Sequence, residues 1–175
     1  MSVRSSIVVL AVAAAVGLLV YGLVSKGDSQ IAVGDPAPRT ALDKLEGGGE
    51  ESLANYRGRW VMVNFWASWC VPCRQEAKAL NQLQRERGGP RFTVVGVDSN
   101  DLSPDAKAFV RRFGVSYPQL RDGNGDLAHE FGTTGVPESY LFNPQGKLKV
   151  PWRGPVDEKI LREQFLPLIP AKGNS

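Results

Sequence analysis

The first feature of the hydrophobic pattern is an uninterrupted apolar segment near the N-terminus. Residues Ile7–Val24 contain no charged side chain and have no polar face, with Arg4 before them and Lys26 after them. About 18 residues is the lower limit for a helix that crosses a bilayer, whereas a core helix would show a polar face. The pattern predicts an uncleaved signal-anchor, with residues 1–6 in the cytoplasm and the rest of the chain outside it. A cleaved secretory signal is the alternative, but a suitable small-x-small cleavage site does not follow.

After a polar linker at residues 25–30, the pattern changes to alternating strands and helices. Two apolar runs, Trp60–Phe65 and Phe92–Val97, are typical of central strands that are covered on both faces. Between them, Val71–Arg87 carries a single apolar stripe, which predicts a helix. Strand, helix and strand in this order form a right-handed parallel unit.

The remaining elements are shorter and continue the alternation. We expect two hairpins, one of Thr40–Leu45 with Glu51–Leu53 and one of Glu138–Phe142 with Lys147–Trp152, and a single strand at Tyr117–Leu120. A helix that ends at Phe113 is expected to have Ser103 as its N-cap and Pro104 in its first turn. Two further helices are expected at Gly125–Phe131 and Asp157–Leu168. Together these elements predict an α/β domain over residues 31–170, with a sheet of mixed direction flanked by helices and a tail at residues 171–175.

The composition fits one ordinary globular domain together with the N-terminal segment. The chain has 175 residues, of which 42% are hydrophobic and 22% charged, and its net charge is +3. This length holds one well-buried domain. The modest charge gives no indication of nucleic-acid binding, which requires a strongly basic surface.

Both cysteines of the chain, Cys70 and Cys73, lie where the first central strand ends and the following helix begins. The unpaired N–H groups and the partial positive charge of a helix N-terminus stabilise a thiolate there. Zinc would need four ligands, and His129 is the only histidine. Covalent haem attachment would need a histidine after Cys73, where Arg74 stands. We therefore expect reversible disulfide chemistry with no metal and no cofactor.

Three segments resemble the membrane-anchored thioredoxin-like proteins of the TlpA/ResA/CcmG (DsbE) group. These are Asn64–Cys73, with its two tryptophans, Gly135–Leu141, with its Val-Pro pair, and the entry segment Val33–Pro38; the resemblance covers about Ile31 to Leu168. It implies a thioredoxin fold with an N-terminal hairpin extension. It also implies that Pro137 is cis and packs against the disulfide.

The resemblance assigns roles to the residues around the cysteine pair. Cys70 is expected to be the exposed nucleophile, and Cys73 the less exposed cysteine that resolves a mixed disulfide. Asn64 stands where cytosolic thioredoxins have a buried aspartate, and an amide cannot take up a proton. Glu76 lies on the apolar stripe, so we expect a partly desolvated carboxyl with a raised pKa that accepts the Cys73 proton, as the matching acid does in ResA-like members. The alternative is a surface glutamate at the stripe edge that reaches water.

A docking surface for clients is expected beside the cysteine pair. Trp69 and the backbone of Val136 and Pro137 would pair with an extended client segment. Trp66 is interpreted as a core aromatic residue.

The resemblance favours a reductase of client disulfides, such as that of apocytochrome c during cytochrome c maturation, which a membrane electron donor of the CcdA/DsbD type re-reduces. An oxidase that introduces disulfides into secreted proteins is the alternative, because Cys-x-x-Cys spacing does not set the redox potential. A non-catalytic binding module with a structural disulfide is a second one. A peroxidase would need a threonine before Cys70, where only Ser68 is available, and a copper-delivery protein would need Cys-x-x-x-Cys.

Overall fold

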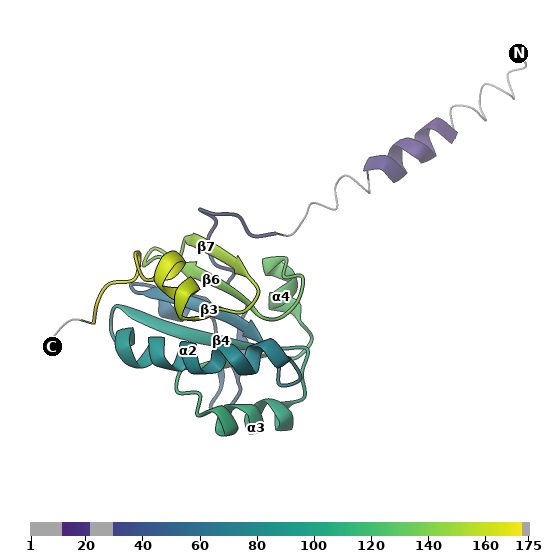
Figure 1. Cartoon of the computed structure of the whole chain (residues 1–175). Coiled ribbons are helices and arrows are strands. Elements are labelled where there is room, and N and C mark those ends of the chain that lie inside the picture. Colours follow the sequence, from purple (N-terminus) through teal and green to yellow (C-terminus); the bar gives the residue numbers. More distant parts are fainter. Residues whose placement is uncertain (1–11, 22–29, 173–175) are drawn as a thin grey trace, which may run out of the picture.

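The computed structural model describes residues 12–21 and 30–172 and contains one mixed sheet with helices packed on it (Figure 1). The strands are β1 (Leu42–Lys44), β2 (Glu50–Glu51), β3 (Trp60–Trp66), β4 (Phe92–Ser99), β5 (Gln119–Asp122), β6 (Glu138–Phe142) and β7 (Leu148–Arg153). The helical elements are η1 (Leu53–Tyr56), α2 (Val71–Arg87), α3 (Ser103–Phe113), α4 (Asp126–Phe131), α5 (Glu158–Ile160) and η2 (Leu161–Phe165).

The sheet has the strand order β2-β1-β5-β4-β3-β6-β7. The three central strands β3, β4 and β5 run parallel, whereas β6, β7, β1 and β2 pair antiparallel with their neighbours. The predicted α/β fold with a thioredoxin-like mixed sheet is therefore confirmed.

The alternation of side chains along β3 decides which helices meet which face of the sheet. Val63 and Phe65 pack in a cluster with residues of η1 and α4. Met62 points to the other face and packs with residues of α2 and η2. Asn64 has the same parity as Met62, so this polar side chain points toward α2 inside the protein.

The predicted N-terminal hairpin is present and extends the sheet beyond β5. β1 pairs with β5 on one side and with β2 on the other. Its turn contains Gly47, Gly48 and Gly49, whose φ angles are 86°, 93° and 95°. L-residues with a side chain rarely adopt these angles, which explains why a glycine triplet occurs here.

The end of the chain and the start of α3 differ from the sequence prediction. The helix expected at Asp157–Leu168 is α5 followed by the π-helix η2, which ends at Phe165. Pro167 explains the earlier end, because proline has no backbone N–H to continue the helical hydrogen bonds. Helix α3 begins at Ser103, so its N-cap is Leu102 and not Ser103.

The predicted signal-anchor at residues 7–24 lies partly outside the described residues, as do residues 1–6 and most of the linker. Residues 12–21 are helical. In the described part of the chain, no helix has both the length and the apolar character that a bilayer crossing requires.

Candidate active site

Cys70 and Cys73 form a disulfide at the N-terminus of α2, with their Cα atoms 5.3 Å apart. Cys70 is the N-cap residue, and the backbone N–H of Cys73 donates a hydrogen bond to Cys70 Sγ over 3.1 Å. A helix N-terminal N–H directed at this sulfur would stabilise a thiolate on Cys70 after reduction. The predicted placement of the pair at the strand-to-helix junction is confirmed.

The prediction that Cys70 is exposed is wrong for this oxidised form. Cys70 is 3% exposed and Cys73 is 2% exposed. The reason is packing, because both sulfurs belong to a cluster with residues of α2 and α3, against which Val136 also packs.

The peptide bond between Val136 and Pro137 is cis, as the resemblance implied. The carbonyl oxygen of Val136 lies 3.7 Å from Cys70 Sγ. A disulfide sulfur carries no proton, so in the oxidised form this distance is a van der Waals contact. Segments far apart in the sequence thus meet at the nucleophile.

Glu76 is fully buried one turn after Cys73, so the alternative of a surface glutamate is wrong. The amide of Asn64 donates a hydrogen bond to its Oε1 over 2.9 Å, and the backbone N–H of Val156 donates to its Oε2 over 3.0 Å. Burial raises the pKa of Glu76 to about 7, although these two hydrogen bonds lower it in part. A carboxyl with such a pKa can both accept and release a proton near neutral pH.

Asn64 joins Glu76 of α2 to the central sheet. Its Nδ2 donates to Glu76 and to Ser139 Oγ, which lies on β6. On its other side, Glu76 lines a cavity of about 390 Å³ together with Val156 and Asp157.

The two tryptophans of the motif differ in environment, as expected. Trp66 is buried, stacks on Phe109 with ring centroids 4.5 Å apart, and donates its indole N–H to Gln119. Trp69 is 59% exposed next to Cys70, and its indole N–H donates to the backbone oxygen of Asn100. Trp69 is thus available to a docking partner.

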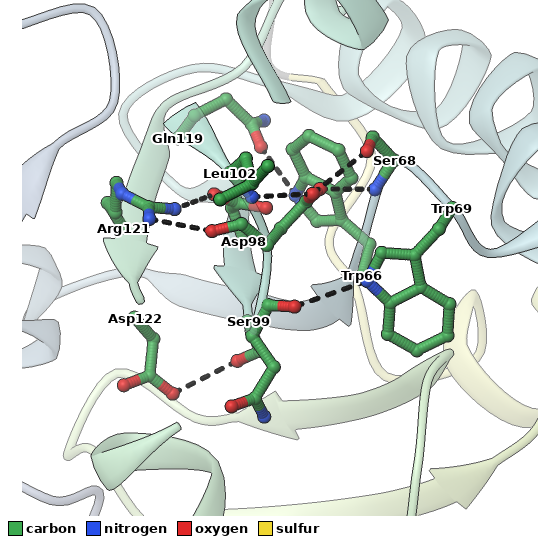
Figure 2. A network of polar contacts seen from close by, with 11 residues as sticks. Trp66, Ser68, Trp69, Asp98, Ser99, Leu102, Gln119, Arg121 and Asp122 are labelled. Carbon is green, nitrogen blue, oxygen red and sulfur yellow. Dashed lines mark hydrogen bonds and ion pairs between the residues drawn. The ribbon is translucent and has the colours of Figure 1, made fainter. Parts of the chain in front are cut away.

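Sequence reasoning missed a polar network beside the cysteine loop, which Figure 2 shows. It consists of Asp98, Asp101 and Arg121 together with Ser68, and it connects β4 and β5 to the loop before α2. One signal was present, because a polar run follows directly after the buried strand β4. The carboxyl ends of parallel strands share one sheet edge, which is the edge where β3 leads into Cys70.

Within residues 12–21 and 30–172, no group of three or more His, Cys, Asp or Glu side chains is placed to hold a metal ion. The Cys70–Cys73 pair and the buried Glu76 offer thiol-disulfide exchange with a nearby proton acceptor.

Comparison with known proteins agrees with this geometry. The model of the AhpC/TSA family matches residues 33–150. Thiol-disulfide oxidoreductase ResA of Geobacillus thermodenitrificans is 27% identical over 168 residues, which are 96% of each chain. Thiol:disulfide interchange protein DsbE of Allochromatium vinosum is 31% identical over 139 residues, which are 78% of this chain and 75% of that protein. A solved structure of a putative DsbE from Chlorobium tepidum matches with a TM-score of 0.74 and 30% identity, over 81% of this chain and 100% of the other.

A disulfide at a helix N-terminus, opposite a cis-proline on a thioredoxin-like sheet, defines the class of thiol-disulfide oxidoreductases. This chain belongs to the AhpC/TSA family and, within it, to the ResA/DsbE group, with Cys70–Cys73 as its redox-active pair. The alternative of a non-catalytic binding module is thereby wrong.

Proposed function

We propose that this protein is a membrane-tethered reductase of disulfides in extracytoplasmic client proteins, with apocytochrome c as a client. Residues 7–24 would anchor the chain and residues 31–170 would form the catalytic domain outside the cytoplasm. The apolar, uncharged segment supports the anchor, and the similarity to ResA and DsbE supports the activity. A membrane electron donor of the CcdA/DsbD type would return the disulfide to the dithiol.

The reaction follows from the two sulfurs and the carboxyl. In the reduced protein, the Cys70 thiolate attacks a client disulfide, a mixed disulfide forms, and one client thiolate leaves. Glu76 then accepts the proton of the Cys73 thiol. The resulting thiolate attacks Cys70 Sγ and releases the second client thiolate. The client gains two electrons, and the protein is left with the disulfide present in this structure.

Client docking is assigned to Trp69 and to the backbone of Val136 and Pro137. Trp69 presents a largely exposed indole beside Cys70. The Val136 carbonyl lies at the disulfide, where a client strand that pairs with the backbone would bring its own sulfur close to Cys70.

The observation that carries this proposal is the buried Glu76, one turn after Cys73 and held by Asn64 and Val156. Resolution of a mixed disulfide requires deprotonation of the buried cysteine. A carboxyl with a pKa of about 7 can perform this step at neutral pH.

The midpoint potential of the Cys70/Cys73 pair tests the direction of transfer. We expect a value close to that of thioredoxin, about −270 mV, together with reduction of a disulfide-bonded apocytochrome c peptide. A potential near about −120 mV, with oxidation of dithiol peptides, would instead establish the oxidase alternative. Insulin reduction by the full chain in detergent provides an independent readout.

A further inference from the structure

The loop between β3 and α2 is held in place in part by a neighbouring loop. Asp101, in the loop that follows β4, accepts a hydrogen bond from the Ser68 backbone N–H over 2.5 Å and one from Ser68 Oγ over 2.9 Å. It also accepts the backbone N–H of Leu102 over 2.7 Å, at the start of α3. One carboxylate thus joins the loop before Cys70 to the N-terminus of α3.

Two further contacts fix the same loop. The indole N–H of Trp69 donates to the backbone oxygen of Asn100 over 3.2 Å, and Arg74 donates to the backbone oxygen of Ser68 over 2.9 Å. Asn100 has a φ of 51°, which is unusual for a residue with a side chain. This conformation turns the chain between β4 and Asp101.

Asp101 is itself held by Arg121 of β5. One terminal nitrogen of Arg121 donates to the Asp101 backbone oxygen over 2.7 Å, and the other donates to Asp98 Oδ2 over 2.7 Å. Asp98 and Arg121 are register partners across β4 and β5, so the pairing of the strands places the two side chains next to each other.

The hydrogen bonds around Asp101 depend on whether the Asp98 carboxyl carries a proton. Asp98 is fully buried, and its Oδ1 has no hydrogen-bond donor among the described residues. The charged neighbours of Asp98 are Asp101 and Arg121. Two ionised carboxylates have no proton to donate, so Asp98 and Asp101 cannot form a hydrogen bond when both are ionised. If Asp98 holds a proton, it can donate that proton to Asp101, whose oxygens also accept the hydrogen bonds from Ser68. Burial, followed by the negative charge of Asp101, raises the pKa of Asp98 to about 7, against the opposing effect of Arg121.

We propose that Asp101 is a positioning residue that fixes Ser68 and Trp69 for client docking, and that Asp98 and Arg121 hold Asp101 in place through one proton shared between the two carboxyls. Loss of that proton leaves two adjacent buried anions with a single guanidinium. The Ser68–Trp69 loop then loses its fixed position, and docking of a protein client weakens. Direct reaction of Cys70 with a small disulfide does not use Trp69, so it changes little. The inference rests on the docking role proposed for Trp69, and it holds for either direction of electron transfer.

The test compares Asp101→Asn and Asp98→Asn in the reduced full-length chain in detergent. The KM and kcat for a disulfide-bonded peptide are measured between pH 6 and 8.5, with hydroxyethyl disulfide as the small substrate. In Asp101→Asn, an amide replaces one acceptor oxygen and faces a donor, so we expect KM for the peptide to rise at least fivefold, with the small-disulfide rate unchanged within twofold.

Asp98→Asn keeps a donor toward Asp101 and an acceptor for Arg121. Its KM should equal the wild-type value at pH 6 and stay constant to pH 8.5, whereas the wild-type KM rises severalfold above pH 7.

Asp126→Asn, an exposed position on α4, is the matched control for loss of one acidic charge. If Asp101→Asn is unfolded, Ser68→Ala decides, because it removes only the hydroxyl bond and should raise KM two- to threefold. A wild-type KM for the folded Asp101→Asn or for Ser68→Ala, or a wild-type pH dependence in Asp98→Asn, would overturn the inference. Failure of the wild-type protein to react with the peptide at all would instead contradict the proposed function.

Discussion

Replacement of Glu76 by glutamine tests the link between burial, protonation and stability at this site. The wild-type carboxylate accepts two hydrogen bonds, from Asn64 and from the backbone of Val156. Glutamine has nearly the same shape and cannot ionise, but it offers only one acceptor. Its amide nitrogen must face one of the two donors, which costs about 1–3 kcal/mol at every pH.

The wild-type protein has a different cost, which depends on pH. The pKa of Glu76 is raised from 4.5 to about 7, mainly by burial. Each unit corresponds to about 1.4 kcal/mol, so the shift is equivalent to about 3 kcal/mol. Because the folded state binds this proton more tightly than the unfolded state, the contribution to stability is fully present below pH 4.5 and is lost as the pH rises through 7. Glu76→Gln should therefore be less stable than the wild type at pH 5 and about equally stable at pH 8.

Urea unfolding of the oxidised full-length chain in detergent, followed by tryptophan fluorescence at several pH values, measures this difference. Glu163→Gln, at an exposed position on η2, is the control for the same chemical change and should follow the wild-type curve. Asp98 also carries a raised pKa, but it contributes equally to both proteins and cancels in the difference. If Glu76→Gln keeps the wild-type pH dependence of stability, the assignment of a neutral, buried Glu76 is refuted. The same variant should slow resolution of the mixed disulfide roughly 100-fold at pH 7.

Four further substitutions have defined outcomes. Cys73→Ser should accumulate a client-linked adduct on non-reducing gels, whereas Cys70→Ser should form none. Trp69→Ala should raise KM for a disulfide peptide about tenfold, since removal of an aromatic anchor from a protein interface costs on the order of 1 kcal/mol or more. It should leave the reaction with a small disulfide unchanged. Gly96→Ala would place a Cβ 2.1 Å from the Oε1 of Gln119, which is nearly buried and bonded to a core tryptophan. The lost hydrogen bond should lower the free energy of unfolding by about 1–3 kcal/mol, measured as a lower urea midpoint with an unchanged slope.

The sequence predicted the elements whose signals are local. The apolar stripe and the glycine pair gave helix α2 its full extent, Val71–Arg87. The continuous apolar run at Trp60–Phe65 predicted a central strand with both faces covered. The final helix was predicted too long, because Pro167 cannot donate the backbone hydrogen bond that would continue it.

The site was predicted unevenly for a similar reason. Glu76 was identified because its position on a buried stripe can be read from spacing within one helix. The exposure of Cys70 was predicted wrongly, because it depends on Val136 and on α3, which reach the disulfide from elsewhere in the chain. Asp101 was not identified at all, since no pattern within the polar run after β4 distinguishes a residue that bonds to Ser68 from one that faces water.

The sequence by itself determined the chemistry: two cysteines at a strand-to-helix junction, in a chain that alternates strands with helices. Helix periodicity and a helix N-terminus are properties of a few consecutive residues, so the sequence contains them directly. Only the tertiary structure decided the proton affinities around that pair. Glu76 receives its hydrogen bonds from residues 12 and 80 positions away, and Asp101 holds a loop 33 positions before it. The desolvation that raises the pKa of a carboxyl comes from all the groups packed around it, and these groups surround it only after distant segments of the chain have folded together.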